Sequence, residues 1–121
     1  MSTAQNPGFR KFRSRLLAGE HLAGTFVKIP TTFATEVLGN IGFDFVVFDQ
    51  EHAPLDAQVL DTMILAARAS DIAGVVRVPN ADPSSILTVL DCGATGVLVP
   101  HIDTKAKAEA IVDACRYRNG H

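Results

Sequence analysis

The sequence predicts an α/β fold in which parallel strands alternate with helices, and two observations support this prediction. Short apolar runs recur along the chain, and each is followed by a stretch with the apolar spacing of a helix. In the clearest run, residues 43–49, the apolar residues are continuous rather than alternating, which is typical of a parallel sheet. With 121 residues, 47% apolar and 20% charged, the chain has the composition of a single globular domain spanning residues 1–121.

The amino-terminal third predicts a leading helix, a strand and a second helix. The pair Asn6-Pro7 has the residue types of an N-cap and a first helical position. Residues 24–28 predict a short strand, and residues 32–41 predict the helix that follows it.

Three further strand–helix units follow with the same pattern. We expect the strands at residues 43–49, 73–78 and 95–100, and the helices at residues 57–68, 83–92 and 105–116. Asp56 and Asp82 are expected to begin two of these helices. Glycines are expected to close the helices at Gly19, Gly42 and Gly93. The result is a leading helix and four strand–helix units with right-handed crossovers.

The sequence leaves open whether this sheet belongs to a closed barrel. An eight-unit barrel needs roughly 250 residues, so four units make about half of one and leave the first and fourth strands as bare edges. The alternative is a small open sheet of the flavodoxin-like kind. A nucleotide-binding version of that sheet would want a glycine-rich turn after the first strand, and residues 28–32 contain no glycine.

Charge and composition exclude several classes of function. Eleven basic against 13 acidic side chains give a net charge of −2, which provides no basic field for nucleic acid. No apolar run reaches the roughly 18 residues of a membrane span, and the start of the chain lacks the order of a signal peptide. The two cysteines, Cys92 and Cys115, have no metal-ligand spacing. We therefore expect a cytoplasmic protein with free thiols.

Polar residues follow the predicted strands where ligands bind in α/β folds: Lys28, Asp49, Arg77 and His101. The densest group is Asp49-Gln50-Glu51-His52, since two carboxylates and an imidazole leave one buried strand together. A carboxylate beside an imidazole fixes its tautomer and raises its basicity, as a general base requires. The alternative is a loop histidine that is hydrogen-bonded for structure, and spacing alone does not decide between them.

Arg77 lies at the end of an otherwise apolar strand, where its fork of N–H groups suits a carboxylate or an enolate oxygen. The alternative is a salt bridge to Asp49 or Glu51, and the two roles are compatible. Asp91 has the position of a helix-end residue. Metal binding has little support from the residues, since Glu51 and His52 are adjacent rather than at a ligand spacing.

Taken together, the motifs resemble the class II, metal-dependent 2-oxo-acid aldolases of the HpcH/HpaI family. The resemblance covers nearly the whole chain in order. In this sequence the motifs are Gly24–Lys28, Glu36, Gly42–Asp49, Glu51–Pro54, Val76–Pro79, Asp82, Ile86, Leu90–Ala94, Gly96–Pro100 and Arg116–His121.

The resemblance implies the amino-terminal half of a TIM (β/α)8 barrel and a carbon–carbon lyase that releases pyruvate, or a similar 2-oxo acid, and an aldehyde. Family members act on 2-dehydro-3-deoxyglucarate and on 4-hydroxy-2-oxoheptanedioate. By matching motif, His52 would be the acid/base residue, Asp49 its partner, and Arg77 the group that binds the pyruvate carbonyl or enolate oxygen. Asp91 would contribute to substrate binding in a neighbouring subunit's site, which implies a homo-oligomer.

The resemblance also implies a divalent metal ion, Mg²⁺ or Mn²⁺. In the family its Glu and Asp ligands lie on later strands, beyond the position of His121, so this chain is expected to lack a complete metal site. The family usually continues with Arg-Gly after the motif that ends at His121. We therefore expect a truncated, weakly active or inactive chain, the alternative being a non-catalytic anion-binding or assembly module.

Overall fold

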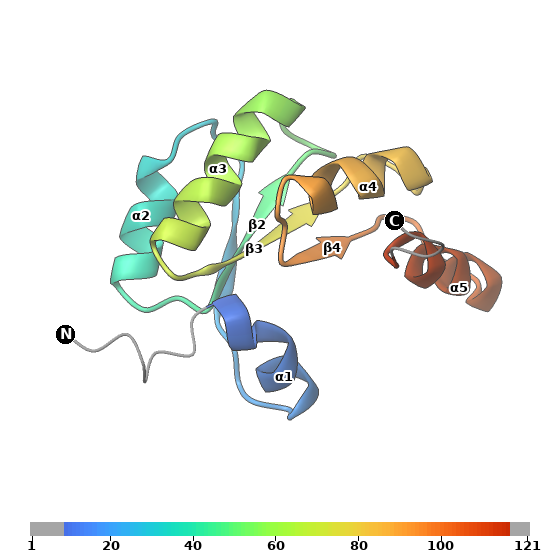
Figure 1. The fold of residues 1–121 in the computed structure, drawn as a ribbon, viewed down its shortest axis with the longest axis horizontal. Coiled ribbons are helices and arrows are strands. Elements are labelled where there is room, and N and C mark those ends of the chain that lie inside the picture. Colours follow the sequence, from blue (N-terminus) through green and yellow to red (C-terminus); the bar gives the residue numbers. More distant parts are fainter. Residues whose placement is uncertain (1–8, 117–121) are drawn as a thin grey trace.

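The computed structural model of the chain describes residues 9–116, which form a four-stranded parallel sheet with helices packed against it (Figure 1). The strands are β1 (Gly24–Val27), β2 (Phe45–Asp49), β3 (Ala73–Arg77) and β4 (Gly96–Leu98). They lie in the order β1-β2-β3-β4, and each neighbouring pair is parallel. A flavodoxin-like sheet would place its first strand between the second and third, so this order excludes that alternative and matches half of a barrel.

Helices connect the strands and follow one another around the sheet (Figure 1). They are a 3₁₀ turn (Phe9–Lys11) with α1 (Phe12–Leu17), then α2 (Phe33–Asn40), α3 (Ala57–Ala69), α4 (Pro83–Asp91) and α5 (Lys105–Ala114). Helix α2 packs on α3, α3 on α4 and α4 on α5. Each predicted strand–helix unit is therefore present.

The predicted element ends agree with the structure except at a few positions. Three glycines adopt the left-handed backbone that closes a helix, with φ of 77° at Gly19, 101° at Gly42 and 98° at Gly93. Strand β4 is shorter than predicted and ends at Leu98, because it is an edge strand and the nearby Pro100 has no N–H to donate. The predicted start at Asn6 lies outside the described residues.

Helix α3 shows how the sequence specifies an element here. The Asp56 carboxylate accepts a hydrogen bond of 2.9 Å from the backbone N–H of Val59, which satisfies one of the free donors of the first turn. Gly74 allows the helix to approach β3 closely, since a Cβ there would lie 3.3 Å from that of Ala67 and 3.2 Å from the Phe48 ring. The buried residues of the helix follow the spacing of one helix face: Leu60, Met63, Ile64, Ala66 and Ala67.

The hydrophobic core lies between the sheet and these helices. It contains the strand residues Val46, Phe48 and Val76, none of which is exposed to solvent, and the buried face of α3. The residues that alternate with them along each strand point to the opposite face of the sheet, because successive side chains of a strand lie on opposite sides.

The opposite face of the sheet is largely open. Its residues include Phe26 and Leu98, which remain 44% and 43% exposed. Helix α1 covers the amino end of this face, where the ring of Phe12 lies 5.5 Å from that of Phe45. The continuous apolar character of the strands thus suits a sheet covered on both faces, but residues 9–116 cover one face fully and the other only in part.

The described residues contain neither a disulfide nor a helix that is long and apolar enough to cross a bilayer. Cys92 and Cys115 are free and partly buried. Burial raises the pKa of both thiols, and for Cys92 the nearby Asp61 and Asp91 carboxylates add to this effect. Both cysteines therefore stay protonated at neutral pH and behave as small packing residues.

Candidate active site

The carboxyl ends of the four strands bring six polar side chains to one edge of the sheet. We call them the rim cluster: Lys28, Asp49, Glu51, His52, Arg77 and His101. Each belongs to a strand end or to the loop that follows it, and this edge is where barrel folds carry their active sites.

Asp49 and Arg77 form the centre of the rim cluster. They are the last residues of β2 and β3 and lie opposite one another in the parallel ladder. The Arg77 Nε donates to Asp49 Oδ1 at 3.0 Å, and Arg77 Nη2 donates to Asp49 Oδ2 at 2.7 Å. This two-point contact satisfies a carboxylate that has no solvent exposure. The salt bridge considered for Arg77 is therefore present.

Further donors surround Asp49. Its Oδ1 also accepts the backbone N–H groups of Glu51 at 3.0 Å and His52 at 3.1 Å, and Lys28 Nζ lies 3.7 Å from Oδ2. The hydrogen bonds from Arg77, and then those from the two backbone N–H groups, hold the pKa of Asp49 well below its usual range, although burial opposes this shift. The same contact raises the pKa of Arg77. Both groups are therefore charged at neutral pH.

Glu51 is the carboxylate that contacts the imidazoles. Its Oε1 lies 3.2 Å from His52 Nε2 and 3.5 Å from Arg77 Nε, and its Oε2 lies 3.2 Å from His101 Nε2. The prediction made Asp49 the partner of His52. In the structure Asp49 reaches only the backbone N–H of His52, since Arg77 and backbone donors occupy its oxygens, and Glu51 lies beside the ring.

The Arg77 side chain is held from two directions. On one side, Asp49 accepts hydrogen bonds from Arg77 Nε and Nη2. On the other, the guanidinium carbon lies 4.7 Å from the centre of the Phe26 ring. Within residues 9–116 the structure gives Nη1 no acceptor, so part of the fork stays available to a ligand oxygen. An arginine fixed in this way is suited to bind a carboxylate or an oxyanion.

The loop after β2 is closed at both ends. The backbone N–H of Gln50 donates to the carbonyl of Arg77 at 2.9 Å, and its side-chain amide donates to the carbonyl of Leu55 at 3.1 Å. These bonds join the loop to β3 and to its own end. Glu51 and His52 are thereby placed beside Arg77.

Asp91 lies apart from the rim cluster. It is the last residue of α4, which runs back from the carboxyl end of β3 toward the amino end of β4 (Figure 1). Asp91 is therefore at the opposite edge of the sheet. Its position agrees with the prediction that it is a helix-end residue. Its contribution to a neighbouring subunit's site stays a prediction.

The residues described do not make a metal centre. Between residues 9 and 116 no group of three or more histidine, cysteine, aspartate or glutamate side chains is placed to hold a metal ion. Asp49 and Glu51 are instead engaged by Arg77 and the two imidazoles. The expectation that Glu and Asp ligands lie beyond His121 stays a prediction.

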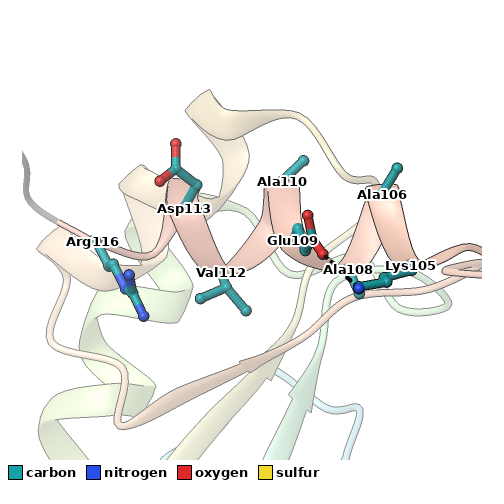
Figure 2. A pocket seen from close by; sticks show the side chains of 8 residues that line it. All are labelled: Lys105, Ala106, Ala108, Glu109, Ala110, Val112, Asp113 and Arg116. Carbon is teal, nitrogen blue, oxygen red and sulfur yellow. Dashed lines mark ion pairs between the residues drawn. The ribbon is translucent and has the colours of Figure 1, made fainter.

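The hollow shown in Figure 2 is not the candidate site. It has a volume of about 690 Å³ and is lined only by α5 and Arg116. Its charged pair, Lys105 and Glu109, is an exposed ion pair of 3.7 Å within one helix, and Val112 at its side is half exposed. All the residues that line this hollow come from one helix and Arg116, whereas the rim cluster gathers groups from four strands.

Three contributions to the rim cluster go beyond the sequence analysis. The sequence places Lys28 and His101 at strand ends and Phe26 within the Gly24–Lys28 motif, but it predicts no role for any of the three, whereas the structure brings all of them to Asp49, Glu51 or Arg77. The alternation of side chains along the strands could have revealed Phe26. It pairs with Val47 and therefore lies on the same face of the sheet as Val47 and as Asp49, two residues later. The contact between His101 and Glu51 depends on the backbone after β4, which spacing does not reveal.

The fold and the rim cluster define half of an α/β barrel with two imidazoles, two carboxylates and a fixed arginine at its carboxyl-end edge. The family's sequence model matches residues 22–121, and the chain belongs to the HpcH/HpaI aldolase/citrate lyase family.

Two relatives illustrate this membership. Over 106 residues the chain is 38% identical to hydroxypyruvate/pyruvate aldolase of Roseobacter denitrificans, covering 88% of this chain and 41% of the relative. Over 107 residues it is 40% identical to 5-keto-4-deoxy-D-glucarate aldolase of Escherichia coli, covering 88% of this chain and 42% of the relative. The chain thus spans about two fifths of the length of these relatives.

Solved structures confirm the fold. The crystal structure of citrate synthase SbnG superimposes with a TM-score of 0.82 at 38% identity, over 88% of this chain and 44% of that one. An HpcH/HpaI aldolase from Desulfitobacterium hafniense gives the same TM-score of 0.82 at 22% identity, which shows the fold alone. The expected fold class, parallel strands and helices forming part of a TIM-like barrel, is confirmed.

Proposed function

We propose that this chain carries the acid–base and oxyanion-binding part of a carbon–carbon lyase, which cleaves a 2-oxo acid reversibly to pyruvate, or a similar 2-oxo acid, and an aldehyde. The observation that carries the proposal is the fixed Arg77 guanidinium beside the Glu51–His52 pair at the carboxyl-end edge. Family membership and the names of the two aldolase relatives support it.

The chemistry requires both groups. Removal of a proton from the methyl group of pyruvate places negative charge on the carbonyl oxygen, and the reaction is feasible only when that charge is stabilised. In the proposal the free N–H groups of Arg77 bind this oxygen. His52 takes the methyl proton in one direction and returns it in the other. Asp49 keeps the guanidinium in place.

A divalent metal ion, Mg²⁺ or Mn²⁺, belongs to the proposal on the strength of the resemblance alone. Residues 9–116 offer no complete site for it, so the roles given above concern this chain's own side chains. A homo-oligomer in the cytoplasm is part of the same proposal, as is a small-molecule substrate rather than nucleic acid.

The proposal is tested by the exchange of pyruvate methyl protons with D₂O, followed by ¹H NMR. We would measure the 121-residue chain alone and joined to the carboxyl-terminal part of the Escherichia coli relative, each with Mg²⁺, with Mn²⁺ and with EDTA. Weak or absent exchange is expected for the chain alone, and clear exchange for the chimera. His52→Ala should reduce the chimera's rate by about 100-fold or more, as loss of a general base does.

Two further variants sharpen the test. Arg77→Lys keeps the charge opposite Asp49 but removes the fork, and should also slow exchange strongly. His21→Ala removes an exposed histidine that lies between α1 and β1, at the other edge of the sheet, and should leave the rate unchanged. A chimera that binds pyruvate without exchange would support the non-catalytic alternative. A chimera in which His52→Ala exchanges as fast as its parent would exclude His52 as the base.

A further inference from the structure

Lys28 is a cation of the rim cluster to which the proposed function gives no role. It follows Val27, the last residue of β1, which pairs with Phe48 in β2. The next residue of each strand therefore places Lys28 beside Asp49, and Asp49 in turn pairs with Arg77. A lysine, an aspartate and an arginine thus form a row across three neighbouring strands, on one face of the sheet.

Asp49 does not fully engage the Lys28 ammonium group. Lys28 Nζ lies 3.7 Å from Asp49 Oδ2, which is an ion-pair distance but too long for a hydrogen bond. The same oxygen already accepts Arg77 Nη2 at 2.7 Å, and Oδ1 accepts three other N–H groups. Among residues 9–116 the structure gives Lys28 Nζ no hydrogen-bond acceptor, so its donors remain available.

The exposed members of this row are its two cations. The side chains of Lys28 and Arg77 are 55% and 20% exposed, whereas that of Asp49 is fully buried. Both cations lie close to the same Asp49 oxygen, so one small ligand with two oxygens can contact both of them. The partly exposed Phe26 ring lies beside the guanidinium and adds an apolar surface. These groups together fit a small anion that has two acceptor oxygens and an apolar end.

A 2-oxo acid has these features, since its carboxylate is bonded directly to the carbonyl carbon and pyruvate ends in a methyl group. We propose that Lys28 Nζ binds the carboxylate of the 2-oxo acid, while Arg77 binds the carbonyl oxygen. The inference rests on the proposed function and adds a protein partner for the substrate carboxylate. Lys28 then makes the site prefer an anionic 2-oxo compound over a neutral one of the same size.

The structural alternative is that Lys28 serves only to neutralise the buried Asp49. An exposed lysine without a hydrogen bond contributes little to stability. Lys28→Gln should therefore change the free energy of unfolding much less than Asp49→Asn does, as measured by urea denaturation of the 121-residue chain. A loss in Lys28→Gln as large as that in Asp49→Asn would overturn the inference.

The ligand test needs no turnover. Pyruvamide is neutral and has nearly the shape of pyruvate, because an amide replaces the carboxylate. Ligand-observed NMR gives the dissociation constants of both compounds for the chimera with the Escherichia coli relative, in one Mg²⁺ buffer for parent and variants. Lys28→Gln should weaken pyruvate binding by about tenfold or more, as expected for loss of a charged hydrogen bond, and leave pyruvamide binding nearly unchanged. Lys28→Arg keeps the charge and should recover most of the affinity for pyruvate.

Lys107→Gln is the matched control for this titration. The Lys107 side chain is also 55% exposed, but its ammonium group pairs with Asp103 rather than with a residue of the rim cluster. Its replacement should leave both dissociation constants unchanged. The inference would be overturned by a parent that binds pyruvate no more tightly than pyruvamide. It would equally be overturned if Lys28→Gln weakened both compounds alike or neither of them.

The exchange assay separates this inference from the proposed function. Lys28→Gln should raise the pyruvate KM of the chimera by about tenfold with little change in the maximal rate, because it removes binding that substrate and transition state share. If His52→Ala exchanges as fast as its parent, the proposed base fails while the preference for pyruvate over pyruvamide stands. If His52→Ala abolishes exchange but Lys28→Gln changes neither the affinity nor the KM, the role of Lys28 fails alone.

Discussion

Asp49 is the residue on which the geometry of the rim cluster depends most. It is an ionised carboxylate without solvent exposure, and a buried charge is tolerated only when it is paired and hydrogen-bonded. Arg77, Lys28 and two backbone N–H groups provide those partners. Removal of the charge at Asp49 would therefore leave Arg77 without its counter-ion and weaken the turn that carries Glu51 and His52.

We expect Asp49→Asn to lower the free energy of unfolding at pH 7 by about 3 kcal/mol, the cost of breaking a buried ion pair. The folded-state pKa of Asp49 lies below its unfolded value of about 3.9, so its stabilising contribution is complete above that pH and is lost as the pH falls toward the folded-state pKa. Urea unfolding of parent and variant at pH 7 and pH 3 should therefore show a smaller difference at pH 3.

Asp103→Asn is the matched control for this experiment. Asp103 also pairs with a cation, Lys107 Nζ at 2.7 Å, but its side chain is 72% exposed. Its replacement should change stability little at either pH. Equal losses of unfolding free energy in the Asp49 and Asp103 variants would show that burial adds nothing to the stabilisation by the Asp49–Arg77 pair.

At this scale the sequence indicated which residues meet but not which atoms. The order of strands and polar residues was enough to bring Asp49, His52 and Arg77 to one edge. Whether Asp49 or Glu51 would face the imidazole depended on side-chain direction, which follows from the 49–77 register and the closed loop. Neither of these can be read from spacing.

Helix termini are the best-specified features at the level of the elements. Asp56 and Asp82 both precede a helix with extended backbone, yet only the Asp56 side chain accepts a hydrogen bond from the first turn. The Asp82 backbone N–H instead donates to the Asn80 side chain, as part of a local turn. Two aspartates that are equivalent in sequence thus have different roles.

Asp56→Ala should therefore destabilise the chain by about 1 kcal/mol through the loss of the α3 cap. Asp82→Ala should cost less, since no cap hydrogen bond is lost there. Urea denaturation of the two variants beside the parent measures the difference. A larger effect at Asp82 than at Asp56 would contradict the assignment of the cap.

The elements themselves could be predicted because glycine, proline and aspartate mark their ends locally. Gly19, Gly42 and Gly93 close helices as expected. The strand ends were less certain, since the length of β4 depends on the ladder with β3 rather than on its own apolar run. Local chemistry therefore specifies helix ends, and pairing specifies strand ends.

The whole molecule has one covered face and one open face. Phe26 and Leu98 are exposed on the open face, beside the two unpaired edges formed by β1 and β4. Exposed apolar surface next to free strand edges favours association. The sequence could not decide between a closing and an open sheet, because strand order depends on long-range pairing. The sequential order in the structure decides for part of a barrel.

We expect the 121-residue chain to self-associate as its concentration rises, which sedimentation velocity would detect. Leu98→Lys places a charge on the open face and should shift the chain toward monomer. Leu65→Lys is the matched control, since Leu65 is 62% exposed on α3, the helix that covers the other face. A monomer at all concentrations, or equal effects of the two lysines, would contradict a role for the open face.

The closed loop after β2 has a wider consequence. Gln50 bonds backward to β3 and forward to Leu55, so the shape of the segment that carries the imidazole is determined within this half of the fold. Under the proposed function, sequence changes outside this loop would alter which substrate binds, while the segment that carries His52 would keep its shape.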